Sequence, residues 1–295
     1  MADHRLQNIL RSELHPFLPG HPSRGIEIER YLRRGIPLPK ETTVDSWTFQ
    51  SRDVNHAFHI ISPPHPRGTV FVIHGYLGFL HDMAAYITGC IRRGFVVVLP
   101  ELPGHGLSEG EPAGIDDFAH YGVFLGDLVT LLAPHASLVP KPWHAIGHST
   151  GATTIWEFLR QCVHEHAFGG ADPFGAVIFV APLVRSAFYY WSLVLRQLSF
   201  GVVKYVPTRN RHEMLPDRMP LSWFDAQVTW HRRPETFHPL FREVCVFQGS
   251  WDGVVAWRYN RQCLMDVFPN CEYVLVPRGT HVMHHRVIEP ILRRF

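Results

Sequence analysis

One serine in this chain lies in a pentapeptide typical of a nucleophile. Residues 147–151 read Gly-His-Ser-Thr-Gly, so Ser149 has a glycine two positions to either side. Residues 142–146 are typical of a short buried strand, and residues 152–162 carry apolar side chains at helical spacing. A strand, a G-x-S-x-G turn and a helix are the context in which a tight turn raises a serine hydroxyl above a sheet. The pattern predicts that Ser149 is a nucleophile.

The two groups that a serine nucleophile requires occur further along the chain. A serine hydroxyl is a weak nucleophile at neutral pH, so it needs an imidazole as base and a carboxylate that fixes the imidazole tautomer. In doubly wound sheets such groups gather beyond the carboxyl ends of the strands. Asp252 follows the expected strand 243–247, and His281 follows the expected strand 273–276. We therefore expect Ser149, Asp252 and His281 to form a catalytic triad.

Alternative interpretations of these residues stay open at this point. Asp252 is also typical of a turn residue that bonds its own backbone, and His281 of a surface or helix-cap histidine. His284 and His285 are competing bases that lie further from the strand end. With His281 they lack both H-E-x-x-H spacing and a carboxylate partner, so we expect no metal site. The competing acids lie within helices, beside the last strand or beyond residue 183: Glu157, Asp217, Asp225, Asp266 and Glu272.

Acyl transfer also requires backbone donors for the oxyanion of the tetrahedral intermediate. One expected donor is the N–H of Thr150, the residue after the nucleophile. The other should come from the loop after the strand 69–73, which makes the main-chain N–H of Tyr76 the expected donor. Gly75 and Gly78 would permit close approach there, although the same residues are compatible with an ordinary turn between a strand and a helix.

The elements that would position these residues follow a regular alternation. Continuous β-branched and aromatic runs, typical of parallel strands buried on both faces, occur at 69–73, 95–99, 142–146, 176–180 and 243–247. Helical patterns follow at 83–93, 116–132, 152–162 and 257–268, and the chain ends with a strand at 273–276 and a helix at 284–294. Two strand candidates, 46–50 and 57–62, precede the first run. This predicts an α/β architecture with a mostly parallel sheet and helices on both faces.

The alternation stops between residues 184 and 240. This region has no buried-strand run, so we expect a helical cap inserted into a core made of residues 45–183 and 241–295. Among its aromatic side chains, which either contact substrate or pack the cap onto the core, the substrate-binding candidates are Tyr189, Trp191, Trp223 and Phe224; Phe200 belongs to the same group. Residues 1–44 form a leader, with a short amphipathic helix at 5–14 and an irregular surface segment as far as Lys40.

Composition narrows the function classes. A chain of 295 residues with 46% hydrophobic and 18% charged residues suits one folded α/β domain with an insertion. A net charge of +2 without a basic run gives no support for a nucleic-acid partner. The 5 cysteines are scattered and include no C-x-x-C pair, which argues against a disulfide framework. We expect no signal peptide and no membrane span, and therefore a cytoplasmic protein.

Several of these features together resemble one superfamily. They are His74-Gly75-Tyr76, the Pro-Gly-His-Gly-Leu-Ser loop at 103–108, the pentapeptide 147–151, Asp252 and the Gly-Thr-His at 279–281. They resemble the α/β-hydrolases, which implies an eight-stranded sheet and a cap after the sixth strand. The chain is similar to the monoacylglycerol lipase and lysophospholipase-like serine hydrolases, a branch linked to the S33 serine aminopeptidases. Glu101 departs from the aspartate that this branch more often has before the Pro-Gly-His-Gly turn, and we interpret His105 as a turn residue.

The resemblance implies a serine carboxylic-ester hydrolase that acts through an acyl-enzyme. Its expected partner is a small-molecule ester, such as a monoacyl lipid or similar apolar acyl ester, with transient contact to a lipid surface as an option and no metal or organic cofactor. An amidase or aminopeptidase on the same triad is the alternative, with Asp217 or Asp225 to hold an amine. A non-catalytic binding protein on a hydrolase scaffold is the third hypothesis. Dehalogenase and epoxide hydrolase chemistry would need Asp in place of Ser149. The oligomeric state is left open.

Overall fold

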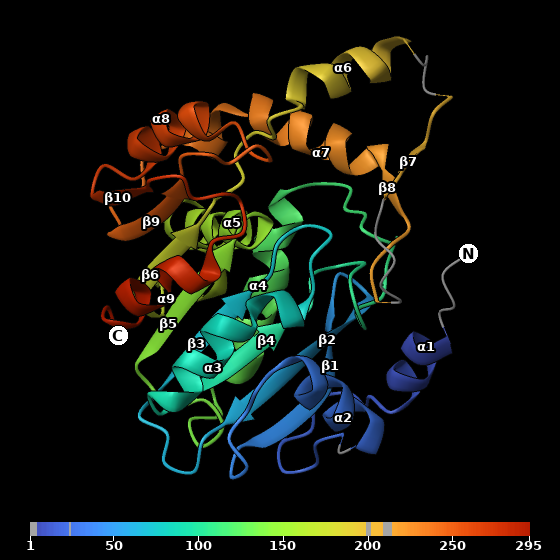
Figure 1. Cartoon of the computed structure of the whole chain (residues 1–295), viewed down its shortest axis with the longest axis vertical. Helices are drawn as coiled ribbons and strands as arrows, with labels where there is room; N and C mark the ends of the chain where they lie inside the picture. Colours follow the sequence, from blue (N-terminus) through green and yellow to red (C-terminus); the bar gives the residue numbers. More distant parts are fainter. Residues whose placement is uncertain (1–4, 24, 199–201, 209–213) are drawn as a thin grey trace.

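An eight-stranded sheet crosses the centre of the molecule in the order β1-β2-β4-β3-β5-β6-β9-β10 (Figure 1). The computed structural model describes residues 5–23, 25–198, 202–208 and 214–295. The pairs β1–β2 and β2–β4 are antiparallel, and the remaining neighbours in the sheet are parallel. The expected mostly parallel sheet is therefore confirmed. Its strands are β1 (Thr43–Ser51), β2 (Val54–Ser62), β3 (Gly68–Ile73), β4 (Phe95–Pro100), β5 (Trp143–His148), β6 (Phe174–Val180), β9 (Val244–Gly249) and β10 (Cys271–Val276).

Helices cover both faces of this sheet. Alternate residues of the segment 70–73 in β3 join two separate apolar clusters, as the two-residue period of a strand requires. The first cluster lies under α4 (Ala119–Leu132), α5 (Thr150–His164) and α8 (Trp257–Val267). The second lies under α2 (Ile26–Gly35), α3 (Ala84–Arg92) and α9 (His284–Leu292). Short 3-10 helices occur at Leu80–Met83, Ala167–Gly169 and Pro234–Phe237.

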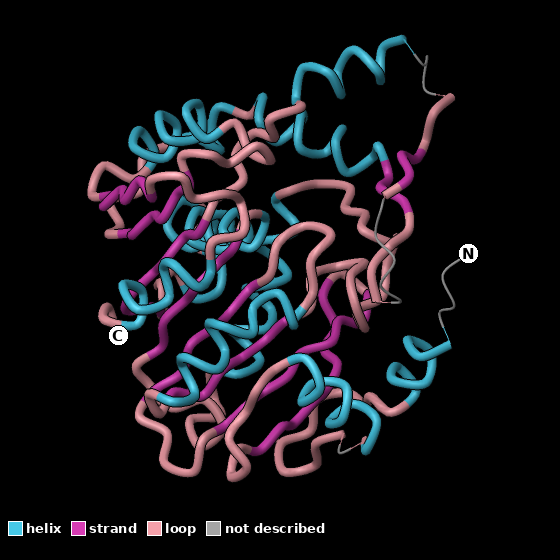
Figure 2. Tube along the Cα trace, viewed as in Figure 1, coloured by secondary structure: helices cyan, strands magenta, loops and turns pink. Residues whose placement is uncertain are grey.

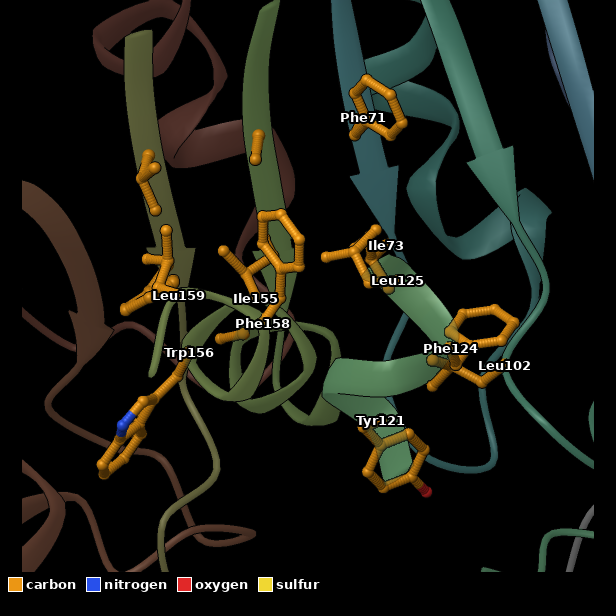
Figure 3. Packing of buried hydrophobic residues seen from close by; sticks show 14 of the residues in the cluster. Phe71, Ile73, Leu102, Tyr121, Phe124, Leu125, Ile155, Trp156, Phe158 and Leu159 are labelled. Carbon is orange, nitrogen blue, oxygen red and sulfur yellow. The ribbon is translucent and has the colours of Figure 1, made fainter. Parts of the chain in front are cut away.

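The first cluster supports the strand ends from which the predicted site residues extend. Figure 3 shows Leu125 of α4 beside Ile73, the last residue of β3, and Ile155 of α5 belongs to the same apolar cluster. These three side chains are 0% exposed. Since close-packed interiors resist displacement, this packing fixes the carboxyl end of β3 relative to α5.

The N-terminal segment contains more regular structure than we expected. α1 (Arg5–Ser12) falls within the predicted helix, but the stretch that we expected to be irregular as far as Lys40 contains α2. Ile28 and Leu32 lie one turn apart on this helix and are at most 1% exposed, so they anchor it on the second cluster. We did not predict this helix because prolines and arginines surround its apolar residues in the sequence.

The described residues between β6 and β9 include the helices α6 (Tyr189–Leu198) and α7 (Leu221–Arg232) and a small pair of strands. Figure 2 shows both helices above the sheet, and β7 (Tyr205–Pro207) pairs with β8 (Arg218–Pro220). α7 has most of its apolar side chains buried, whereas α6 buries only Tyr189 among its residues. Phe200, which we grouped with the cap aromatics, lies outside the described residues.

A buried charge fixes α7 to the helix that follows Ser149. Glu157 of α5 is 0% exposed and accepts hydrogen bonds from Arg160 Nε at 3.0 Å and from Trp230 Nε1 of α7 at 2.6 Å. Arg233 forms a bidentate pair with Asp117 at 2.9 and 2.6 Å near the end of the same helix. α7 is therefore held to the core at two points.

No helix in the described ranges is long and apolar enough to cross a membrane.

Removal of Glu157 should loosen α7 and destabilise the fold. In Glu157→Ala the buried Arg160 loses its main partner and Trp230 Nε1 loses its acceptor, so the free energy of unfolding should fall by about 3 kcal/mol. Glu289→Ala removes an exposed partner of Arg93 and should cost less than about 1 kcal/mol. Urea denaturation followed by tryptophan fluorescence measures both variants. Equal losses would contradict an anchoring role for Glu157.

Candidate active site

Ser149 occupies a strained turn between β5 and α5. Its φ and ψ are 53° and −115°, a backbone conformation that non-glycine residues seldom adopt. A Cβ at Gly151 would lie 2.2 Å from Ile73 O, and a Cβ at Gly147 would lie 2.5 Å from Ala152 N. Both glycines are therefore required by close approach of the backbone. This is the local geometry that lifts a serine side chain above a sheet edge.

Asp252 and His281 lie within hydrogen-bonding distance. Asp252 is in the turn after β9, and its Oδ2 lies 2.9 Å from His281 Nδ1 in the loop after β10. Its Oδ1 accepts the N–H groups of Val254 at 2.8 Å and Val255 at 3.1 Å. Gln248 Nε2 donates to Oδ2 at 3.0 Å. Asp252 is thus both a turn residue that bonds its own backbone and the partner of His281.

The environment of Asp252 favours its ionised form. Burial raises the pKa of this carboxyl, but the hydrogen bond and charge of His281, with the backbone N–H groups of Val255 and Val254, outweigh that effect. The net result is a pKa below the ordinary value. A carboxylate that stays ionised can hold the His281 Nδ1–H and stabilise a positive charge on that ring.

A second histidine connects His281 to the serine turn. His148, the residue before Ser149, donates its Nε2–H to the main-chain oxygen of His281 at 3.1 Å, and the two rings lie 4.8 Å apart. Burial, with the neighbouring charges of His281 and His284, lowers the pKa of His148 well below its ordinary value. His148 is therefore a neutral donor that ties the His281 loop to β5.

His284, which we considered as a competing base, packs against His148 and pairs with Tyr86. Its Nδ1 is 2.8 Å from Tyr86 OH, and its ring lies 4.9 Å from that of His148. Burial lowers the pKa of His284 to about 4. Among the described residues, no group of three or more His, Cys, Asp or Glu is arranged to hold a metal ion.

The expected oxyanion donors lie in the loop after β3 and at the start of α5. A Cβ at Gly75 would lie 3.0 Å from Ser149 Cβ, so the segment 75–76 passes close to the nucleophile. Thr150 is the first residue of α5, where helix geometry leaves N–H groups without an intrahelical acceptor. The role of the Tyr76 and Thr150 N–H groups as oxyanion donors stays a prediction, supported by this close approach and by the position of Thr150 at the start of α5.

Two neutral histidines hold the loop that contains Tyr76. His74 Nε2 accepts the N–H of Leu102 at 3.0 Å, which leaves its Nδ1–H to donate to Gly75 O at 2.9 Å. His105 Nε2 accepts the N–H of Leu77 at 3.1 Å, and its Nδ1–H donates to Pro103 O at 2.9 Å. Burial lowers the pKa of His74 to about 3 and that of His105 to about 4. Sequence reasoning did not predict these links, although the motifs contain both residues.

The four cap candidates have different positions. Trp223 of α7 stacks on the ring of Tyr76 with centroids 3.9 Å apart and donates Nε1–H to Tyr121 OH at 3.0 Å. Tyr189 and Phe224 pack against each other with centroids 5.5 Å apart. Trp191 on α6 is 73% exposed. Only Trp223 of the four contacts the loop that contains the expected oxyanion donor, among the contacts described.

From the lowered pKa of Asp252 we predict how the stability of the fold changes at low pH. Because this pKa is lower in the folded chain than in the unfolded chain, the ionised carboxylate stabilises the fold above about pH 4–5, and this contribution is lost as pH falls through the folded value. Asp252→Asn should be less stable than wild type at pH 7, with a difference that shrinks as the pH falls from about 5 through the lowered pKa of the folded chain. Urea denaturation across this range measures it. Asp53→Asn, in the exposed β1–β2 turn, is the control, and a constant difference for Asp252→Asn would contradict the lowered pKa.

Comparison with known proteins identifies relatives of this chain. The family model described as "Serine aminopeptidase, S33" matches residues 64–220. The monoglyceride lipase homolog of Monkeypox virus is 32% identical over 126 residues, which are 41% of this chain and 41% of that protein. The alignment thus spans about two fifths of the length of this curated relative.

Solved structures show the same fold at low identity. A soluble variant of monoglyceride lipase from Saccharomyces cerevisiae, in complex with a substrate analog, superposes with a TM-score of 0.69 at 14% identity, over 88% of this chain and 97% of that one. Est1E from Butyrivibrio proteoclasticus with bound ferulic acid gives 0.60 at 15% identity, over 83% and 94%. Since the S33 model covers more than half of the residues and the sheet has the matching architecture, the chain belongs to the S33 serine aminopeptidase family of α/β-hydrolases.

Proposed function

We propose that this chain is a serine hydrolase that cleaves carboxylic esters, with Ser149 as nucleophile, His281 as base and Asp252 as the acid that orients it. The observation that carries the proposal is the 2.9 Å hydrogen bond between Asp252 and His281, in a loop that His148 ties to the turn at Ser149. Three groups from separate strand ends, each with the chemistry that acyl transfer needs, support a shared role.

The mechanism follows from the roles of these groups. Ser149 Oγ attacks the ester carbonyl carbon while His281 Nε2 takes its proton, and Asp252 holds the Nδ1–H of the resulting imidazolium. The N–H groups of Tyr76 and Thr150 stabilise the oxyanion. His281 then gives the proton to the departing alcohol, which leaves an acyl-enzyme. Water, activated by the same imidazole, releases the acid and restores Ser149.

Apolar surroundings favour an ester of an apolar acyl group. The stacked rings of Tyr76 and Trp223 bring aromatic surface from the oxyanion loop and from α7, which suits an acyl chain. The carboxylates that an aminopeptidase would use to hold an amine are less suitable, because Asp225 pairs with Arg196 at 2.7 Å and Asp217 is exposed. The relatives described as monoglyceride lipases lead us to propose a monoacyl lipid or a similar ester as substrate.

We further propose that residues 184–240 act as a cap on a core of residues 45–183 and 241–295, with 1–44 as an N-terminal leader. The contacts of α7 with Glu157, Asp117 and Tyr121 support a fixed inner half of this cap. The exposed apolar side chains of α6 support a separate outer half.

Ester hydrolysis should depend on Ser149. The assay uses p-nitrophenyl esters of increasing acyl length beside a panel of aminoacyl anilides. The wild type should cleave the esters, and kcat/KM for them should fall about 10⁴-fold or more in Ser149→Ala. Ser192→Ala, at a half-buried position of α6, is the matched control and should keep wild-type activity. Cleavage of anilides but not esters would favour the aminopeptidase alternative, and unchanged ester cleavage by Ser149→Ala would refute the proposal.

Two tryptophans of the cap should differ in their effect on activity. Trp223→Ala removes the ring that stacks on Tyr76, so the oxyanion loop should lose its position and kcat/KM for a short soluble ester should fall about 10- to 100-fold. Trp191→Ala changes an exposed residue and should leave this value within about twofold. Steady-state kinetics on both variants test this difference. Comparable losses would show that the stack has no special role.

A further inference from the structure

The N-terminal helix α1 contacts the loop that follows β4. Figure 1 shows α1 on the side of the molecule where β1 and β2 form the sheet edge. Leu10 anchors the helix with 0% exposure, while Gln7 and Arg11, four residues apart, share the face that meets the loop. α1 lies outside the residues 64–220 that the family model matches.

Arg11 binds three consecutive carbonyl groups of that loop. Its Nε donates to Leu107 O at 3.2 Å, and its Nη2 donates to Gly106 O at 3.3 Å and to Ser108 O at 2.7 Å. Gln7 Nε2 donates to the same Gly106 O. Guanidinium donors have a fixed planar geometry, so one arginine with three acceptors restricts the loop more than a single contact would.

The inner side of the loop is held by a second charged group. Glu101 Oε2 accepts the N–H of Leu107 at 2.8 Å, and a Cβ at Gly106 would lie 1.4 Å from the same oxygen. Burial lowers the pKa of the Arg11 guanidinium, and the negative charges of Glu101 and Glu109 act in the opposite direction. The backbone of 106–108 is thus fixed between an internal carboxylate and an external guanidinium.

The same loop holds the oxyanion segment through His105. His105 precedes the three carbonyl groups that Arg11 binds, and its Nε2 accepts the N–H of Leu77 at 3.1 Å. Leu77 has a φ of 53°, a conformation that is costly for a non-glycine residue and persists only where its surroundings hold it. Leu77 directly follows Tyr76, whose N–H is the proposed oxyanion donor.

We propose that Arg11 is a positioning residue for the oxyanion hole, acting through the 104–108 loop and His105 on the Tyr76–Leu77 backbone. This inference rests on the proposed ester hydrolysis, in which Tyr76 N–H stabilises the oxyanion. It gives the N-terminal helix a role in transition-state stabilisation that does not require contact with substrate. Loss of Arg11 should therefore act on kcat rather than on substrate binding.

The test compares Arg11→Ala with wild type in three measurements. kcat on a p-nitrophenyl ester should fall about 10- to 100-fold with KM changed less than about twofold, since only the transition state uses the oxyanion donor. Affinity for a boronic acid that forms a tetrahedral adduct should fall by a similar factor. Hydrogen exchange of the Leu77 amide, followed in a peptide that spans residues 74–79, should become faster.

Matched variants separate positioning from general destabilisation. Arg242 also binds backbone carbonyl groups, including Gly175 O at 2.6 Å, but at the start of β6 away from the site, so Arg242→Ala should change none of the three measurements. Arg11→Lys keeps the charge without the planar fork and should show an intermediate kcat, and it replaces Arg11→Ala if the latter does not fold. In a double-mutant cycle, the variant that combines Arg11→Ala with His105→Gln should lose little more activity than the less active of the two single variants.

Three outcomes would overturn the inference: wild-type kcat in folded Arg11 variants, a change confined to KM, or unaltered exchange at Leu77. If the wild type cleaves no ester while Arg11 variants still show faster Leu77 exchange, the proposed function fails and the structural link from Arg11 to the loop stands.

Discussion

The close contact between α5 and β3 determines where the Ser149 hydroxyl lies. Side chains at 147 or 151 would collide with backbone atoms, so two glycines permit the approach, and the turn between them takes Ser149 to a φ of 53°. Such a conformation costs about 1–3 kcal/mol and persists only where neighbouring contacts hold it. Here the N–H of Ser149 donates to Val180 O at 2.9 Å, and Ser149 O accepts the N–H of Leu183 at 3.2 Å. Packing of the sheet thus sets the position from which the proposed chemistry starts.

Neutral buried histidines connect the loops around that turn. His74 and His105 join the loops after β3 and β4, and His148 joins the end of β5 to the loop after β10. Burial lowers the pKa of each of these rings, so each keeps one donor and one acceptor nitrogen and can bridge two backbone groups. α7 is also linked to the loop after β3, because Trp223 stacks on Tyr76. The site is a set of loops fixed to one another as well as to the sheet.

The sequence predicted the sheet well because its strands are continuous β-branched runs. It placed Asp252 and His281 just after two of the expected strands, and their side chains lie 2.9 Å apart. It missed α2, whose apolar residues stand among arginines and prolines. It did not predict the histidine bridges, since each depends on two loops that are distant along the chain. The sequence did not distinguish Trp191 from Trp223 as a substrate-binding candidate, because the direction of a side chain depends on how its helix packs.

We propose that the surroundings of Ser149 activate its hydroxyl, which then forms the covalent intermediate. The most direct measurement is labelling of the native protein with an alkyl fluorophosphonate, followed by intact-mass analysis and peptide mapping. We expect one phosphonyl group per chain, located on Ser149, and loss of labelling after denaturation or in His281→Ala. Absence of labelling in native protein, or a label on another residue with Ser149 unmodified, would contradict it.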